Sequence, residues 1–246
     1  MLEKRLRKLL VWLRRTPIHP QWLIPRTRAY EHVVRNLSGR VLDVGCADRW
    51  IERRISSVSQ YIGLDYPPTG AVLYGAKPDV FGTADALPYR TGSIDAVVML
   101  EVLEHLEHPE ATIREISRVL KEEGLLLLSV PFMYPIHDEP QDFQRYTKYG
   151  LRREIRSKSF EILEMHQVLG SVKSTGLIVN LSISGSLIAA LRERSVKALA
   201  VFPVLLLIPV VNIACWFLSR VLPNFPGLTN GYWLVASKQS SEAGGQ

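Results

Sequence analysis

The sequence predicts an α/β fold in which a doubly wound, mostly parallel sheet of seven strands is covered by helices on both faces. Short apolar runs typical of buried strands recur from residue 41 onward, and helical patterns alternate with them. The connections between these segments are short, as in other sheets of this kind. The chain of 246 residues is 47% apolar, which is enough for a large core and excludes a disordered chain.

The expected strands are residues 41–44, 61–64, a segment near Val80, 94–100, 125–130, 160–169 and 231–237. The expected helices are residues 26–37, 50–57, 109–120 and 147–157. Gly124 is expected to end the helix that begins at Pro109, because glycine is common just after a helix. Thr147 is expected to open the last helix, because its hydroxyl can cap the first turn.

A nucleotide-type cofactor site is expected where the first two strands end. Gly45 follows the first strand and lets the backbone approach a ligand closely, although a plain tight turn would also use it. Asp65 ends the second strand about 20 residues later, where a carboxylate can accept hydrogen bonds from a ribose. Asp85 and Glu101 fall at the same edge of the sheet, beyond the carboxyl ends of the strands, where ligands bind in such folds.

The turn after the first strand indicates which nucleotide is bound. A dinucleotide needs several glycines around its pyrophosphate, but only Gly45 is present, and Ala47, Asp48 and Arg49 fill the other positions. Asp48 would repel a phosphate. S-adenosylmethionine carries an amino acid with a sulfonium at this end and tolerates acidic groups, so the residues favour it as the cofactor.

These stretches resemble the motifs of class I S-adenosylmethionine-dependent methyltransferases. Residues 40–49 are similar to the first motif of that family, and residues 82–88 and 93–105 are similar to its adenine-contacting and fourth-strand motifs. The resemblance covers residues 38–168 and resumes near residue 231. It implies the class I methyltransferase fold, with an antiparallel last strand between the fifth and sixth strands. Ala47 and Arg49 stand where the family usually has glycine.

The resemblance also implies roles for cofactor-binding residues. Gly45 would contact the cofactor, Asp65 would bind the ribose hydroxyls, and Asp85 would accept from the adenine amine, with a backbone group of Ala86 beside it. Asp43 would organise the loop or reach the methionine amino group. A buried structural hydrogen bond is the alternative for Asp43.

The end of the fourth strand carries two further candidates. Glu101 and His105 are one helical turn apart in sequence, at the mouth of the strand, and Glu101 is expected to contact the cofactor. His105 is a candidate general base, although a packing or capping role is the favoured interpretation of this histidine.

The segment from residue 131 to residue 147 is the most polar cluster of the chain. It is similar to a pattern in bacterial members of the family, some of them associated with quinone or surface-glycan modification, and this implies a loop that holds the acceptor. His137 would take the acceptor's proton, held by Asp138 or Asp142. In the favoured alternative Asp142 pairs with Arg145 to stiffen the loop and His137 is a bystander. No metal-binding pattern is visible, so no metal is expected.

The N-terminus combines basic charge with leucines on one helical face, which is typical of a helix on an anionic membrane. A helix that packs on its own domain is the alternative. A signal peptide is excluded because no uninterrupted apolar core follows the charges. The basic residues of this region, against the single acid Glu3, are Lys4, Arg5, Arg7, Lys8, Arg14, Arg15, Arg26 and Arg28.

Residues 171–230 form an insertion before the last strand and contain two uncharged apolar stretches, residues 174–191 and 198–219. The last strand must return to the same sheet, so the insertion has to leave and re-enter the same side of a membrane. A two-helix hairpin and a monotopic arrangement both satisfy this condition. The monotopic one is favoured because it keeps the basic residues 192–197 on the cytoplasmic side. A soluble lid or a dimer interface is the alternative.

The predicted organisation is an N-terminal helix and linker (1–28), a methyltransferase core (29–170), the membrane-associating insertion (171–230), the last strand (231–238) and a disordered tail (239–246). The expected protein acts at the cytoplasmic side of a membrane, which it contacts through residues 1–15 and 172–226. It methylates a lipid, a quinone or a lipid-linked glycan. The alternatives are a non-catalytic binding protein and a nucleic-acid methyltransferase. A nucleic-acid partner is disfavoured, because residues 100–103 lack the family's motif for amino-group methylation. Acceptor identity and oligomeric state stay open.

Overall fold

The computed structural model describes residues 12–25, 29–55, 57–67, 77–156 and 159–240. The chain forms two compact units, which are described separately. The sheet unit comprises residues 28–132, 136–166 and 231–246. The helical unit comprises residues 1–27, 133–135 and 167–230.

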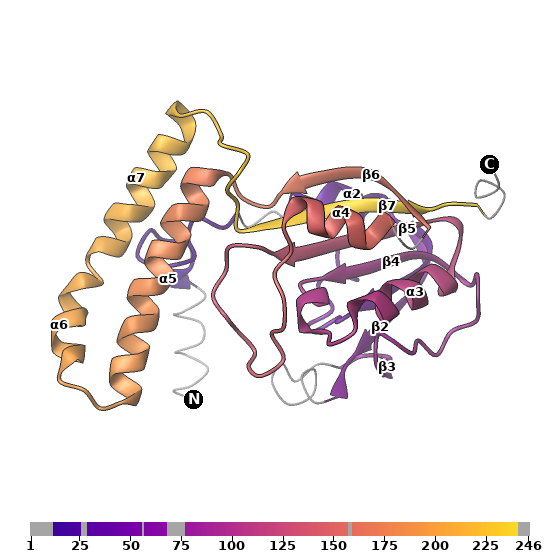
Figure 1. The fold of residues 1–246 in the computed structure, drawn as a ribbon, viewed down its shortest axis with the longest axis horizontal. Helices are drawn as coiled ribbons and strands as arrows, with labels where there is room; N and C mark the ends of the chain where they lie inside the picture. Colours follow the sequence, from indigo (N-terminus) through magenta and orange to yellow (C-terminus); the bar gives the residue numbers. More distant parts are fainter. Residues whose placement is uncertain (1–11, 26–28, 56, 68–76, 157–158, 241–246) are drawn as a thin grey trace. The chain divides into compact units, whose positions relative to one another are not determined.

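The sheet has seven strands in the order β3-β2-β1-β4-β5-β7-β6 (Figure 1). The strands are β1 (Ser38–Val44), β2 (Ser57–Asp65), β3 (Val80–Phe81), β4 (Ile94–Leu100), β5 (Leu120–Pro131), β6 (Phe160–Gln167) and β7 (Gly231–Lys238). Neighbours from β3 to β5 pair in parallel, and β7 pairs antiparallel with β5. The predicted fold is therefore confirmed, including the place of the last strand between the fifth and sixth.

The core of the sheet unit lies between the central strands and the helices packed on them. β1 and β4 bury residues on both faces, as strands do in a sheet covered on two sides. Helix α3 (Pro109–Val119) begins with a proline that suits a first helical turn, and it buries Ile113 and Ile116. Each such side chain contributes about 1.5–3 kcal/mol by leaving water. The other helical elements of this unit are α2 (Glu31–Asn36), η2 (Leu103–His105) and α4 (Lys148–Arg156).

Several expected boundaries are wrong. The expected helix over residues 50–57 is a turn at residues 50–54, in which Ile51 is buried and residues 52–54 are exposed. Residue 57 already belongs to β2. The fifth strand begins at Leu120 rather than residue 125, since it continues the pairing with β4 across a register shift. The expected helix over residues 26–37 is confirmed only for Glu31–Asn36, and residues 26–28 lie outside the described residues.

The helical unit is built on α5 (Ser171–Arg192), α6 (Lys197–Val204) and α7 (Leu207–Val221). Helices α5 and α7 lie side by side (Figure 1). Their buried side chains Asn180 and Asn212 are joined by a hydrogen bond of 2.8 Å. Asn212 also donates to the carbonyl oxygens of Pro17 and His19, at 2.6 and 3.0 Å. These bonds attach the N-terminal segment to the middle of the helix pair, because buried amides need partners.

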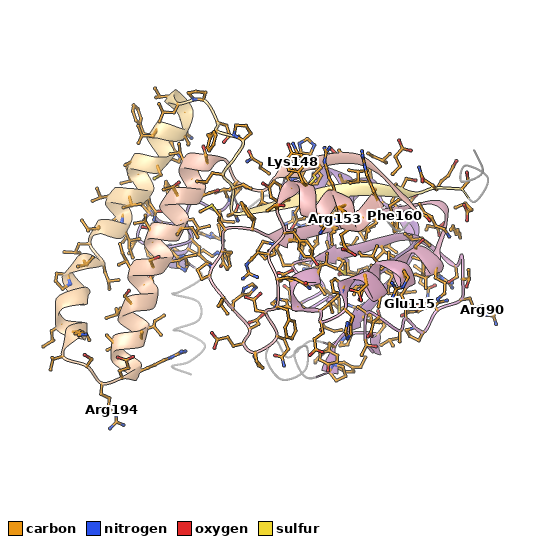
Figure 2. All side chains as sticks on the ribbon, viewed as in Figure 1. Arg90, Glu115, Lys148, Arg153, Phe160 and Arg194 are labelled. Carbon is orange, nitrogen blue, oxygen red and sulfur yellow. The ribbon has the colours of Figure 1, made fainter. Side chains whose placement is uncertain are left out.

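The predicted insertion before the last strand is present as these three helices. In the part of the chain that the structure describes, α5 is long and apolar enough to cross a membrane by length and composition, and α7 is shorter. The charged turn after α5 carries Arg194, whose side chain projects from the end of the helix pair (Figure 2). The expected amphipathic helix of residues 1–15 lies almost entirely outside the described residues.

Candidate active site

A cavity of about 620 Å³ opens at the carboxyl ends of β1, β2 and β4, within the sheet unit. Parallel strands bring their carboxyl ends to one edge, so residues far apart in the sequence meet there. The cavity is lined by these predicted residues: Asp43, Gly45, Asp65, Asp85 and Glu101. Three predicted site residues, Ala86, His137 and Asp142, do not line it.

The turn after β1 has the backbone shape of a glycine-rich turn although it holds one glycine. Gly45 has a φ of 77°, and an added Cβ would lie 2.4 Å from Val102 Cγ2. Ala47 and Arg49 adopt φ values of 42° and 57°, which side chains disfavour by about 1–2 kcal/mol each. Ala47 and Arg49 therefore add side chains at two glycine positions of the family motif but keep the left-handed backbone that glycine adopts in other members of the family.

Arg49 directs its charge to other side chains rather than to the cavity, which it does not line. Its guanidinium pairs with Glu52 at 2.8 Å and with Asp79 at 3.0 Å. The same group lies 4.9 Å from the ring centroid of Tyr61. An arginine at the third glycine position thus leaves the space for a cofactor open.

Asp65 holds the turn and lines the cavity with the same carboxylate. It accepts hydrogen bonds of 2.8 Å from the backbone N–H groups of Ala47 and Tyr66. Each carboxylate oxygen has two lone pairs, so these bonds leave further acceptor capacity for ribose hydroxyls. The residue is 5% exposed, and this combination of burial and cavity lining fits the ribose role.

Asp43 is buried in β1 and accepts a hydrogen bond of 2.6 Å from the hydroxyl of Tyr61. Burial, which disfavours the charged form, raises the pKa of Asp43 to about 7. Both interpretations from the sequence are compatible with this position, because the carboxyl group makes a buried hydrogen bond and also lines the cavity. A cofactor ammonium beside it would favour the ionised form.

The loop after β3 and the loop after β5 each form part of the cavity wall. Asp85 lines the cavity with Thr83 and Ala84, while the exposed Ala86 stands outside it. Sequence reasoning did not identify Trp50 or Phe143, both of which line the cavity. Trp50 directly follows the turn after β1, and Phe143 lies in the polar loop after β5. Their positions beside these motifs are the feature of the sequence that could have identified them.

His105 lies on the cavity wall, although the sequence favoured a packing role for it. Its Nδ1 is 2.5 Å from the carbonyl oxygen of Gln141. A carbonyl oxygen only accepts, so Nδ1 carries the proton and Nε2 carries the lone pair of the neutral ring. Glu101, at the end of β4, accepts a hydrogen bond of 2.6 Å from the hydroxyl of Ser129. His105 and Glu101 thus both line the cavity beyond the end of β4.

His137 and Asp142 form the expected contact, with Nδ1 and Oδ2 3.2 Å apart. Asp142 also accepts from the backbone N–H of His137 at 2.9 Å and from the guanidinium of Arg145 at 2.7 Å. The Arg145 guanidinium lowers the pKa of Asp142 to about 2. The contact of Asp142 with His137 and its ion pair with Arg145, which the sequence offered as alternatives, are therefore present at once, because the Asp142 carboxylate binds both partners.

Glu104 lies fully buried next to both histidines. Its Oε1 is 3.7 Å from Nε2 of His105 and 3.9 Å from Nε2 of His137. Within the described residues neither carboxylate oxygen of Glu104 has a hydrogen-bond partner, and burial raises its pKa well above the usual range. One ligand atom from each of the three residues lies within 4.8 Å of the others, so the group could hold a metal ion. No metal site was predicted here from the sequence, because His137 lies on a separate loop from Glu104 and His105.

The family model described as a methyltransferase domain matches residues 21–171. A probable S-adenosylmethionine-dependent methyltransferase of Mycobacterium tuberculosis is 32% identical over 125 residues, which are 49% of this chain and 42% of that protein. A ubiquinone biosynthesis O-methyltransferase of Xanthomonas oryzae pv. oryzae is 35% identical over 124 residues, 46% of this chain and 51% of that protein. The chain thus matches about half the length of these curated relatives.

Solved structures show the same fold. A methyltransferase of Archaeoglobus fulgidus that depends on S-adenosylmethionine aligns with a TM-score of 0.53 and 15% identity, covering 94% of this chain and 99% of that one. The family match covers more than half of the chain, and the cavity lies where this fold binds its ligand. The chain therefore belongs to the methyltransferase-domain family as a class I methyltransferase whose cofactor is S-adenosylmethionine.

Proposed function

We propose that the protein transfers a methyl group from S-adenosylmethionine to a lipid, quinone or lipid-linked glycan acceptor at the cytoplasmic face of a membrane. The observation that carries the proposal is a cofactor cavity in the same chain as an exposed apolar helix pair. A membrane would confine the enzyme and an apolar acceptor to one surface. The ubiquinone O-methyltransferase among the relatives supports an acceptor of this class.

In the proposed complex each of several residues on the cavity wall contacts a different part of the cofactor. The backbone at Gly45 passes close to it, Asp65 binds the ribose hydroxyls, and Asp85 accepts from the adenine amine. Asp43 and Glu101 are assigned to the methionine end. When bound, S-adenosylmethionine would supply an electrophilic methyl group to an oxygen, nitrogen or carbon of the acceptor and would leave as a neutral thioether. The protein therefore has to align the two molecules and remove one proton.

Proton removal is assigned to the histidine cluster behind the acceptor end. His105 is on the wall, and its ring meets that of His137 edge-on with centroids 4.9 Å apart. Asp142 lies 3.2 Å from Nδ1 of His137 and would orient it, which is the catalytic alternative to the bystander role favoured for His137 from the sequence. His137 and Asp142 do not line the cavity, so we propose that they act through His105 rather than on the acceptor directly.

Helix α7 supports a membrane partner through its exposed face. The large apolar residues on this face recur every three or four positions; they are Leu207, Val210, Ile213, Phe217 and Val221, each more than half exposed. Residues at this spacing form one stripe along a helix. Ile208 and Asn212, on the opposite side, are buried. Contiguous exposed apolar surface of this kind is typical of membrane or protein interaction sites.

The attachment of the N-terminal segment favours the monotopic arrangement. Asn212 bonds the carbonyls of Pro17 and His19 near the middle of the helix pair. If α5 and α7 crossed the bilayer, this segment with the exposed Arg14 and Arg15 would lie deep in hydrocarbon, where charged side chains are costly. Helices that lie along the membrane surface keep both arginines at the headgroups.

The test is methyl transfer from labelled S-adenosylmethionine to bacterial lipid extracts presented in vesicles. We expect labelled, organic-soluble product with the full chain and none with Asp65→Ala. Cofactor binding without transfer to any lipid extract would instead favour the non-catalytic alternative. Transfer to RNA or DNA would favour the nucleic-acid alternative.

A further inference from the structure

We propose that Glu104, His105 and His137 form a binding site for a divalent transition-metal ion. One ligand atom from each of the three residues lies within 4.8 Å of the others, and Nε2 of His105 and Nε2 of His137 lie 3.7 and 3.9 Å from Oε1 of Glu104. The site lies behind the cavity wall at the acceptor end. It goes beyond the proposed methyl transfer, and its binding test does not depend on that activity.

The two histidines are oriented as metal-binding histidines are. His105 donates Nδ1–H to the carbonyl oxygen of Gln141 at 2.5 Å. His137 has Nδ1 within 3.2 Å of the Asp142 carboxylate. Metal-binding histidines nearly always donate their second ring N–H to a carbonyl or carboxylate, which sets the tautomer and the ring direction. In both rings the opposite nitrogen, Nε2, is then the one nearest to Glu104.

Glu104 provides independent evidence for a cation. Its side chain is 0% exposed, and within the described residues its two oxygens lack hydrogen-bond partners. An unpaired polar group is costly to bury, and a charged one is more costly still. Arg145 acts on Glu104 through its charge but forms its ion pair with Asp142. A metal ion would satisfy the carboxylate and offset this cost.

The donor set indicates the kind of ion. Imidazole nitrogens suit zinc, iron, nickel and copper, whereas magnesium and calcium prefer sites built from oxygen. Bonds of about 2.1 Å place neighbouring ligand atoms about 3.0–3.4 Å apart and opposite ones about 4.2 Å apart. The distances of 3.7 and 3.9 Å from Glu104 to the histidines are close to this range. Small side-chain shifts would complete the site for Zn²⁺.

The ion would join two segments that wall the acceptor end of the cavity. Glu104 and His105 belong to η2 after β4, and His137 belongs to the loop after β5. Besides the ligands, this loop is attached to η2 by a backbone bond of 2.9 Å from Phe143 N–H to the Glu104 carbonyl. A bound ion would stiffen this wall. It would also occupy Nε2 of His105, so in the metal-loaded protein the positive charge of the ion, rather than that nitrogen, would favour an ionised acceptor.

The experiment titrates Zn²⁺, and Mg²⁺ for comparison, into chelator-treated full-length protein by calorimetry, with Tm measured in the same samples. We expect one Zn²⁺ per chain, a rise in Tm of about 5 °C or more, and at least about tenfold weaker binding of Mg²⁺. His137→Ala and Glu104→Gln should each weaken zinc binding at least about tenfold. The matched control is His108→Ala, because His108 is close in sequence but its side chain is 69% exposed.

Equal zinc affinity in wild type, His137→Ala and Glu104→Gln would overturn the site, as would the absence of stoichiometric binding. If Glu104→Gln does not fold, His137→Ala, whose position lies on a surface loop, decides the question. S-adenosylmethionine affinity is measured in the same samples. Cofactor binding without zinc binding would overturn the metal site and leave the proposed function standing. Zinc binding without methyl transfer would overturn the proposed function and leave the metal site standing.

Discussion

The hydroxyl of Tyr61 on β2 donates a hydrogen bond of 2.6 Å to the carboxyl group of Asp43 on the neighbouring strand β1. The pair places a titratable group with a pKa of about 7 inside the sheet, at the floor of the cofactor cavity. A carboxyl group in such a place responds to pH near neutrality, which leads to the first prediction.

Asp43→Asn should remove a pH dependence of stability. The folded pKa of about 7 is raised above the usual 3.8 by burial, so the unfolded chain loses the proton first. The contribution of Asp43 to stability is present below about pH 4 and is lost as the pH rises to about 7. Urea unfolding should therefore show the free energy of unfolding of the variant gaining on that of wild type by about 1.4 kcal/mol for each pH unit from pH 5 to about pH 7, with little further change up to pH 8. A constant difference across this range would contradict the assignment.

Asp65→Ala should weaken S-adenosylmethionine binding at least about tenfold, which is about 1.4 kcal/mol. The carboxylate is expected to bind the ribose, and it also accepts from the Ala47 N–H. Calorimetric titration measures the affinity, and circular dichroism checks that the variant is folded. Asp48→Ala is the control, because Asp48 is in the same turn but its side chain is 71% exposed. Equal losses in both variants would contradict a specific role of Asp65.

Gly45→Ala should reduce both stability and cofactor binding, because the new Cβ would meet Val102 Cγ2 at 2.4 Å on a backbone with φ of 77°. The control is Gly92→Ala, which has a φ of 62° but nothing within 4 Å of the added Cβ. The control should lose only about 1–2 kcal/mol from the backbone strain. Adding Val102→Ala should recover part of the loss at position 45, measured by denaturation and by calorimetry. No recovery would show that the contact with Val102 is not the cause.

Val210→Ser together with Phe217→Ser should reduce flotation of the protein with anionic vesicles. Both residues belong to the exposed stripe of α7, where they are 60% and 59% exposed, and each buried apolar side chain contributes about 1.5–3 kcal/mol to membrane binding. Leu163→Ser is the control, since Leu163 is 56% exposed on β6. Undiminished flotation of the α7 variant would argue against this face as the membrane surface.

The sequence alone was sufficient for the alternation of strands and helices and for the identity of the cofactor edge. Gly45, Asp65 and Asp85 each end or follow an apolar strand, and parallel pairing then brings them together whatever the details of packing. The expected helix over residues 50–57 was wrong because single-residue burial at Ile51 cannot be told from the start of an amphipathic pattern.

The acceptor end was decided by tertiary structure. His105, Gln141 and Glu104 come together because the loop after β5 folds back on η2, and this contact joins residues more than 30 positions apart. The sequence favoured a packing role for His105, whereas the fold places it on the cavity wall.

The sequence by itself thus determined the sheet, the cofactor and the presence of an apolar insertion, because these depend on local periodicity and on motifs within a few residues. Only the tertiary structure decided which side chains share a wall and which carboxyl groups are buried without partners. The physical reason is that burial and pairing depend on long-range contacts, which raise the pKa of Asp43 and enclose Glu104 between two histidines.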